Sequence, residues 1–237
     1  MIIKKEKKGN VTIYVVEKKI MSENIDIIRN KFLNRDSIDL LIDHDADVYG
    51  DNGILLVRFR KHILPKKNTN AFYDNVIKFA RNVSTNRGNT TGSHSKTKNV
   101  RNNPKIMSNI LGYYDKWGPA HKSVFKRKGV PAPMGVHETK FLKDYPDLFK
   151  KCVPLIQDID KLYKKLLPKY HTAQFNKANK TPFRIANTSF TTITTNVNFQ
   201  TTVHLDKGDD IEGFGNLTVI ERGSSYKGAE TCFPRYG

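Results

Sequence analysis

The stretch that decides the predicted fold is "TSFTTITTNVNFQTTVHLDKGDD", Thr188 to Asp210. Threonine, valine, isoleucine and phenylalanine dominate its first part, and these residues favour extended strands. It continues into His204 and Asp206, which are one residue apart. Residues i and i+2 of an extended chain point to the same side. The stretch therefore predicts a strand whose end brings an imidazole and a carboxylate to one point, as a metal site requires.

The segments on either side of this stretch predict an α+β chain. From Thr181 onward β-branched runs are broken by glycines, which indicates strands joined by turns. Upstream, hydrophobic residues three and four apart predict a core helix over 147–167, which begins behind Pro146 and which Pro154 should kink or split. The other predicted elements are a strand over 10–19, a helix over 22–35, a polar loop over 43–53, a strand over 54–64 and a helix over 71–83.

The charge of the chain points to a polyanionic partner. Lys and Arg number 41 against 23 Asp and Glu, a net charge of +18. Nucleic acid comes first among such partners, because phosphate contacts reward Lys and Arg through counterion release. The alternative is a lysine-rich proteome encoded by an AT-rich genome. Two segments carry the expectation of phosphate contacts: the basic, hydrophobe-poor loop 82–105 and the patch 126–128.

Composition also sets the predicted domains and compartment. We expect an N-terminal α/β segment of unassigned role over 1–81, the basic flexible loop over 82–105, and a further domain over 106–237, whose oxygenase-like class rests on the resemblance described below. The chain has two cysteines, no apolar run that could span a bilayer and no secretory signal. These features predict an intracellular protein of cytoplasm or nucleus, and a viral origin stays open.

The His-x-Asp pair is a weak signal when taken alone. With 7 histidines and 23 acids in 237 residues, chance gives about 0.7 such pairs. A strand-end histidine beside a solvated aspartate in a turn is the simpler reading of the pair. The surrounding sequence therefore has to decide between the two.

The neighbourhood of the pair resembles the TET/JBP family of iron(II)- and 2-oxoglutarate-dependent oxygenases. The matching pieces are Asn196 to Phe199, Val203 to Asp209 and Tyr226 to Gly228. Members of this family oxidise the 5-methyl group of thymine or 5-methylcytosine in DNA, and the resemblance is greatest to the JBP-like thymine-hydroxylase branch and its viral relatives. It covers roughly residues 108–237. It implies a double-stranded β-helix core (jelly-roll, cupin-like) with supporting helices.

The resemblance also implies roles for single residues. His204 and Asp206 would be two of the three iron ligands, and the cofactors would be Fe(II) and 2-oxoglutarate. Asp209 and Asn198 would bind the substrate base, since a carboxylate accepts from cytosine N4–H or thymine N3–H. Arg184, expected on the preceding strand, would hold a carboxylate of 2-oxoglutarate. The alternatives are a turn residue for Asp209 and a surface arginine on an edge strand for Arg184.

The third ligand is the point at which the sequence departs from the family pattern. The family takes a second histidine and then an arginine from later strands, and no histidine follows His204 here. We therefore expect a domain that is incomplete at its C-terminus, with the rest supplied by a further segment or a second chain, unless His137 or His171 serves from upstream. The function expected is a dioxygenase acting on DNA. A non-catalytic basic DNA-binding remnant and an oxygenase for protein side chains are the alternatives.

Overall fold

The structure is a computed structural model that describes residues 2–83, 106–115, 119–131, 135–198, 200–206, 209–223, 228 and 230–236. Its strands are β1 (Ile2–Lys8), β2 (Val11–Val16), β3 (Ala46–Gly50), β4 (Leu55–Phe59), β5 (Met107–Asp115), β6 (Val136–Glu138) and β7 (Thr192–Val197). Its α-helices are α1 (Lys66–Ala80), α2 (Pro119–Arg127), α3 (Lys140–Asp144), α4 (Pro146–Leu166) and α5 (Pro168–Ala178). The expected α+β class is thus present, and almost all of the predicted basic loop 82–105 lies outside the described residues.

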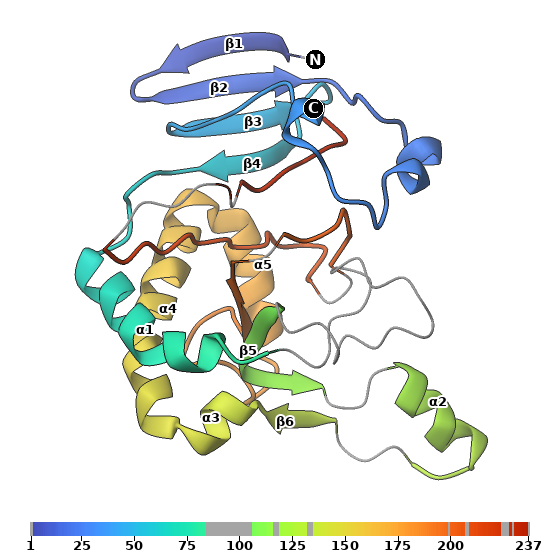
Figure 1. Cartoon of the computed structure of the whole chain (residues 1–237), viewed down its shortest axis with the longest axis vertical. Coiled ribbons are helices and arrows are strands. Elements are labelled where there is room, and N and C mark those ends of the chain that lie inside the picture. The colour runs from blue at the N-terminus through green and yellow to red at the C-terminus, as the bar shows by residue number, and fades with distance from the viewer. Residues whose placement is uncertain are drawn as a thin grey trace.

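The first sheet has the order β1-β2-β3-β4 and forms one end of the molecule (Figure 1). β2 and β3 run parallel, whereas the two outer pairs are antiparallel. The inner strands bury Tyr14, Val16, Ala46 and Val48 as a small core of their own. This sheet confirms the strands predicted over 10–19 and 54–64.

The helical core lies next to this sheet and is built around α4, which packs against α1 and α5 (Figure 1). The predicted helices over 71–83 and 147–167 are confirmed as α1 and α4. The core of this part consists of Phe72, Val76, Ala80, Leu111, Phe141, Phe149, Cys152, Leu155, Ile156 and Ile185. Arg58 of β4 donates to the carbonyl of Leu166 and so joins the first sheet to the end of α4.

The second sheet has the order β6-β5-β7, and both pairs are antiparallel. Gly112 allows β5 to lie close to the turn that precedes β7. Its φ is +94°, and a Cβ atom there would stand 2.5 Å from the carbonyl oxygen of Thr191 and 2.8 Å from Cδ1 of Ile185. Only glycine meets both conditions, because other residues rarely adopt such a φ and the space is filled.

Several predicted elements are wrong in extent. Residues 43–53 are not simply a polar loop, because β3 passes through them and buries Asp47 against Arg58 and Arg60, at 2.7 and 2.8 Å. The helix over 22–35 is reduced to the 3-10 turns Ser22–Ile27 and Arg35–Ser37, since Asn30 has a φ of +63° that ends a right-handed helix. Pro154 does not split α4, which is described as one helix from Pro146 to Leu166.

The strand-rich C-terminal part is the main difference from prediction. After β7 the described residues contain no strand, and residues 181–191 form turns. A β-branched run becomes a strand only where a partner strand satisfies its backbone. The segment 216–222 lacks one in the described part of the chain, and its Leu217 is 76% exposed.

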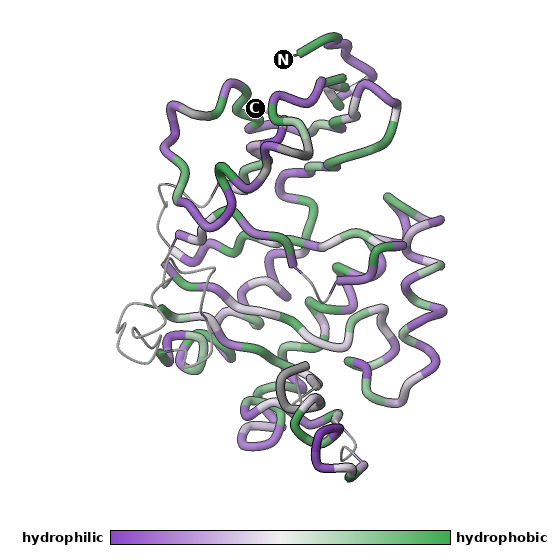
Figure 2. The backbone as a smooth tube through the Cα atoms, turned by 90° about the vertical axis from the view of Figure 1, so that its right-hand side faces the viewer, coloured by the Kyte–Doolittle hydropathy of each residue, from purple (hydrophilic) through white to green (hydrophobic). Residues whose placement is uncertain are grey.

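The C-terminal residues return to the first sheet after crossing the helical core. The carbonyl of Arg235 accepts from the N–H groups of Lys19 at 2.8 Å and Ile20 at 3.2 Å. Tyr236 packs against the core of the first sheet. Both ribbon views place the C-terminal end beside this sheet (Figures 1 and 2).

Hydrophobic and hydrophilic residues are interleaved along the tube in Figure 2. In keeping with this, none of the helices that the structure describes has the length and apolar character needed to cross a membrane.

We predict that Gly112→Ala lowers the free energy of unfolding by at least about 2 kcal/mol, since the new methyl group adds a clash to a strained φ. Denaturant unfolding followed by circular dichroism measures the loss. Gly129→Ala is the matched control, because Gly129 has a φ of +65° with nothing within 4 Å of a Cβ atom. An equal loss in both variants would show that the close packing of Gly112 against Thr191 and Ile185 does not contribute to stability.

Candidate metal centre

His204 and Asp206 lie together in an irregular segment that follows β7, not at the end of a strand as the sequence pattern predicts. Nε2 of His204 is 3.6 Å from Oδ1 of Asp206. The histidine side chain is 25% exposed and the aspartate side chain 69% exposed, so the pair opens to solvent. The segment is not a regular strand, but the two side chains still converge on one side of it.

The hydrogen bonds of His204 determine which nitrogen is available to a metal. Nδ1 lies 2.6 Å from the carbonyl oxygen of Thr202. A carbonyl only accepts, so Nδ1 carries the proton and the neutral imidazole keeps its lone pair on Nε2. This arrangement, with a backbone carbonyl orienting the other ring nitrogen, is the usual second contact of a metal-binding histidine.

A cation fits between the two atoms. When the imidazole is neutral, its Nε2 lone pair and the carboxylate oxygen 3.6 Å away repel each other, and a cation between them removes that repulsion. Two metal–ligand bonds of about 2.1 Å each span the gap easily. His204 and Asp206 therefore fit two positions in the coordination sphere of a divalent metal, with an imidazole and a carboxylate of the kind that non-haem iron takes.

Asp209 adds a second carboxylate to the same surface. Partial burial, which removes water from the carboxylate, raises the pKa of Asp209, and the negative charge of Asp206 raises it further. Gly215 lies beside it, because a Cβ atom there would stand 3.5 Å from Oδ2 of Asp209. The structure thus brings Asp209 near the His204 and Asp206 pair.

Two other predicted residues lie elsewhere. Asn198 follows β7 and has a φ of +51° and an exposed side chain, a backbone conformation that asparagine adopts more readily than most residues. The prediction that Arg184 lies on a strand is wrong, because Arg184 lies in the turns before β7. The chain folds back on itself there, and the N–H of Ile185 donates to the carbonyl of Phe190. The guanidinium of Arg184 lies 5.2 Å from the ring centroid of Phe175, and its Nη1 is buried without a hydrogen-bond partner.

The upstream histidines do not complete the metal centre. His137 lies on β6 with its ring 6.3 Å from that of Tyr114, and His171 lies on α5 against Asp160. Among the residues that the structure describes, no group of three His, Cys, Asp or Glu side chains could hold one metal ion.

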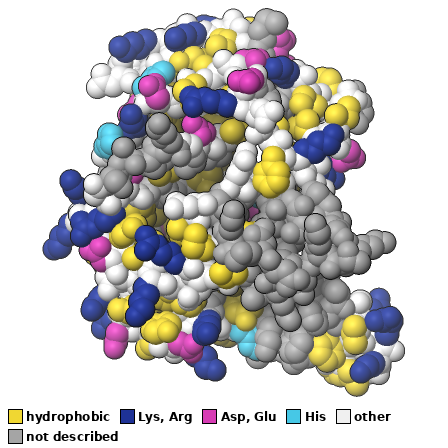
Figure 3. All heavy atoms as spheres, in the orientation of Figure 1, with side chains coloured by type: hydrophobic (Ala, Val, Ile, Leu, Met, Phe, Trp, Pro, Cys, Tyr) yellow, Lys and Arg dark blue, Asp and Glu magenta, His cyan; other side chains and the backbone are white. Residues whose placement is uncertain are grey.

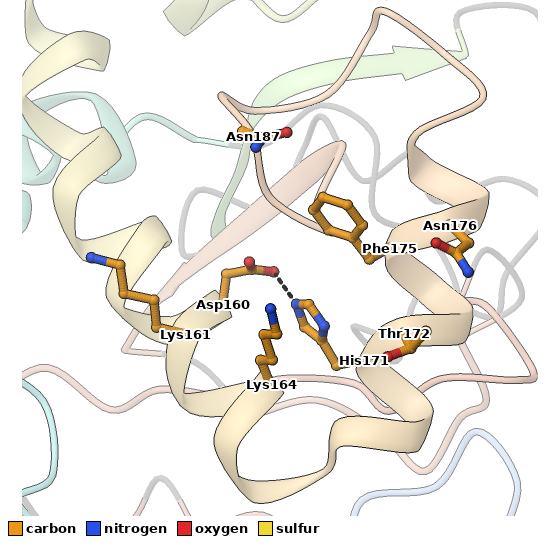
Figure 4. Close-up of a pocket in the computed structure, with 8 residues that line it drawn as sticks. All are labelled: Asp160, Lys161, Lys164, His171, Thr172, Phe175, Asn176 and Asn187. Carbon is orange, nitrogen blue, oxygen red and sulfur yellow. Dashed lines mark hydrogen bonds and ion pairs between the residues drawn. The ribbon is translucent and has the colours of Figure 1, made fainter.

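A pocket of about 380 Å³ between α4 and α5 surrounds the Asp160–His171 pair (Figure 4). Asp160 Oδ1 accepts from His171 Nε2 at 3.2 Å, from Ser189 N–H at 2.9 Å and from the Ser189 hydroxyl at 2.6 Å. The hydroxyl of Ser189 donates to the carboxylate of Asp160 and not to the imidazole of His171. Asp160, His171 and Ser189 therefore do not have the arrangement of a catalytic triad. They form a buried polar junction of α4, α5 and the turn before β7.

Sequence reasoning missed this junction and also missed the N-terminal contacts of the metal centre. Asp160 lies within a helical pattern that signals only a core face, and a single aspartate gave no reason to expect burial. Residues 30–33 contact residues 200–203 through their backbone, and backbone contacts leave no residue-type signal.

Comparison with known proteins identifies the class of domain. Residues 121–237 match the family model Tet_JBP, described as the oxygenase domain of the 2OGFeDO superfamily. The C-terminal half of the chain is therefore similar to the oxygenase domain of the TET/JBP family, whose superfamily uses iron and 2-oxoglutarate. The matched residues include every residue of the candidate metal centre.

Several relatives match between about a third and about half of the chain. The bifunctional helicase and thymine dioxygenase JBP2 of Leishmania braziliensis is 37% identical over 111 residues, 47% of this chain and 9% of that protein. JBP2 of Leishmania tarentolae is 42% identical over 83 residues, 35% of this chain and 8% of that protein. The thymine dioxygenase JBP1 of Trypanosoma brucei brucei is 29% identical over 130 residues, 55% of this chain and 14% of that protein. The matches thus span a small part of these relatives, and no solved structure matches the chain.

We predict that Asp160→Ala lowers the free energy of unfolding by about 3 kcal/mol, because it leaves buried donors of His171 and Ser189 unpaired. Ser189→Ala removes only one of the three bonds and should cost about 1 kcal/mol. Chemical denaturation of both variants measures the difference. If Asp160→Ala cost no more than Ser189→Ala, the junction would not be important for stability.

We also predict that Asp209→Asn stabilises the fold at neutral pH. A folded-state pKa above 3.8 means that the ionised carboxyl destabilises the fold at high pH, and that this penalty disappears as the pH falls through the raised pKa. The variant should therefore unfold at a higher temperature than the wild type at pH 7 and at the same temperature near about pH 3.

Thermal unfolding at both pH values tests this expectation. Asp51→Asn, at an exposed turn, is the control for the loss of one negative charge from a chain of net charge +18. Stabilisation that persists in acid, or that Asp51→Asn reproduces, would contradict the proposed repulsion between Asp209 and Asp206.

Proposed function

We propose that this chain contributes to an iron(II)- and 2-oxoglutarate-dependent dioxygenase that oxidises the 5-methyl group of thymine or 5-methylcytosine in DNA. The convergence of His204 Nε2 and Asp206 Oδ1, within a domain that matches the TET/JBP family, carries this proposal. The names of the relatives, thymine dioxygenases, favour thymine as the base.

In this proposal the chain's own residues hold the metal. His204 would bind through Nε2, since its Nδ1 proton is engaged by the carbonyl of Thr202, and Asp206 would bind through Oδ1. Iron(II) with 2-oxoglutarate and oxygen supplies the oxidising chemistry when bound. A third protein ligand would come from outside the described residues or from a second chain.

Asp209 and Asn198 are proposed to bind the substrate base. Asp209 is close enough to Asp206 to feel its charge, and it would accept a hydrogen bond from an N–H on the base edge, which orients the methyl group. Asn198 stands on the chain between β7 and His204, with an exposed amide that can donate and accept. Arg184 is proposed to bind a carboxylate of 2-oxoglutarate, and its buried unpaired Nη1 is the observation that supports this role.

The DNA backbone would be held by the positive charge of the chain. Lys and Arg side chains appear around the first sheet, over the helices and on α2, with fewer acids among them (Figure 3). Lys126, Arg127 and Lys128 are exposed at the end of α2, which extends away from the helical core (Figure 1). Such residues gain affinity for DNA by releasing its counterions.

The finer fold is part of the proposal. We suggest that β5, β6 and β7 are strands of a double-stranded β-helix, with α1, α3 and α4 as its supporting helices. We also propose an intracellular site of action, as the DNA substrate requires.

One observation favours a second function. The described residues supply two metal ligands and not three, whereas the net charge of +18 suits DNA binding without catalysis. A non-catalytic DNA-binding protein is therefore the alternative, and the presence or absence of iron binding separates the two.

We predict that the chain, mixed anaerobically with iron(II) and 2-oxoglutarate, gives the visible charge-transfer band of the chelated complex. His204→Ala should abolish the band, because it removes the imidazole ligand, and should leave DNA affinity within about twofold, because phosphate contacts are made elsewhere. Absorption spectroscopy and DNA binding at fixed salt measure the two effects.

His62→Ala is the matched control, because His62 is an exposed histidine in the loop after β4. It should keep both the band and the DNA affinity. A wild-type chain that binds DNA without forming the band would favour the non-catalytic alternative. Loss of DNA affinity in His204→Ala would contradict the separation between metal centre and phosphate contacts.

A further inference from the structure

The connection between β2 and β3, residues 17–45, contacts the residues that immediately precede His204. The N–H of Asn30 donates to the carbonyl of Val203 at 2.8 Å, and the N–H of Val203 donates to the carbonyl of Lys31 at 3.0 Å. The side-chain amide of Gln200 donates to the carbonyl of Leu33 at 3.1 Å. Segment 30–33 therefore lies alongside residues 200–203, although about 170 residues separate the two in sequence.

These contacts control the backbone next to a metal ligand. Both backbone polar groups of Val203 are bonded to segment 30–33, and His204 follows immediately. Thr202 is buried, and its carbonyl orients the imidazole of His204. Fixing residues 202 and 203 thus fixes where the His204 side chain begins and which nitrogen it presents.

Segment 30–33 is itself anchored to the first sheet. Lys19 pairs with Asp39 at 2.8 Å, and Leu40 and Ile42 pack against the core of the first sheet. On the other side, Arg35 lies 3.7 Å from Glu230, close to the C-terminal residues that bond to Lys19. The connection is therefore held at both ends while its middle contacts the residues that immediately precede His204.

We propose that segment 30–33 is a positioning element of the metal centre, and that the first sheet serves to hold it there. This inference rests on the proposed function, because it concerns the site that would bind iron. It gives a role to the N-terminal part of the chain, which lies outside the residues that match the family model. The segment touches neither metal nor substrate and acts through the backbone of Val203.

Asn30 is the residue at which the segment can be perturbed. Its φ of +63° lies in the left-handed region, which asparagine and glycine adopt readily. Proline fixes φ near about −65° and has no N–H to donate. Asn30→Pro should therefore move the backbone and remove the bond to Val203, whereas Asn30→Gly should preserve both.

The test is anaerobic calorimetric titration of the full chain with iron(II), combined with amide hydrogen exchange of the peptide that contains residues 200–206. Asn30→Pro should weaken iron binding about tenfold to a hundredfold, the usual effect of disturbing the contacts behind a ligand. It should also remove the exchange protection of Val203. Asn30→Gly should match the wild type in both measurements.

His62→Pro controls for general destabilisation by proline. His62 has a φ of +51° and is exposed, so proline is equally unsuited to its backbone, but it lies in the loop after β4. Its iron affinity should equal that of the wild type once the folded fraction is taken into account. If His62→Pro weakened iron binding as much as Asn30→Pro, or if Asn30→Pro bound iron normally, the positioning role would be refuted.

Hydrogen exchange separates failure of this inference from failure of the proposed function. A wild-type chain that binds no iron would refute the proposed metal site. Protection of Val203 that Asn30→Pro removes would, even then, support segment 30–33 as the element that orders the His204 backbone. A Val203 amide that exchanges freely in the wild type would refute the inference whatever the metal affinity.

Discussion

The bonds that converge on Asp160 are the interaction on which the C-terminal half of the chain depends. Asp160 is 8% exposed, and one of its oxygens accepts from His171 and twice from Ser189. A buried carboxylate costs several kcal/mol unless donors surround it, so α5 and the turn before β7 must stay in place around α4. Because β7 begins just after that turn, the junction also fixes the position of β7, from which the chain continues to His204.

A second constraint acts on the far side of the candidate centre. The segment that carries His204 and Asp206 forms no strand in the described part of the chain, so no sheet holds it there. Its described backbone contacts are instead with residues 30–33, in the connection between β2 and β3. A domain boundary drawn at residue 106 or 121 would cut these contacts, although the sequence match begins only at residue 121.

The sequence was sufficient to predict those helices and strands whose own pattern of hydrophobic or β-branched residues indicates the element. The helices α1 and α4 follow from hydrophobic residues at helical spacing, and β2 follows from a short β-branched run. His204 and Asp206 do approach within 3.6 Å, but in an irregular segment and not on the strand whose alternation suggested the pair.

The strands predicted after β7 failed for the opposite reason. Whether a β-branched run becomes a strand depends on a partner segment, and the partner is a property of the whole fold. The burial of Asp47 and Asp160 could not be predicted for the same reason. Each carboxylate is paired with donors that lie 11 or more residues away along the chain. Residues 30–33 left no signal because their contacts use N–H and C=O groups that nearly every residue has.

The charges near the candidate centre oppose those of the chain as a whole. Asp206 and Asp209 repel each other, as the raised pKa of Asp209 indicates, whereas Asp210 is compensated by Lys177 at 2.8 Å, which lowers the pKa of Asp210. A small region of uncompensated carboxylates in a chain of net charge +18 would attract a divalent cation and repel a phosphate. Under the proposed function, phosphates would therefore be held by basic residues elsewhere on the chain (Figure 3), and a base would have to leave the DNA helix to reach the centre. A divalent metal bound by Asp206 would reverse the local sign, so that metal binding and approach of the nucleic acid would favour each other.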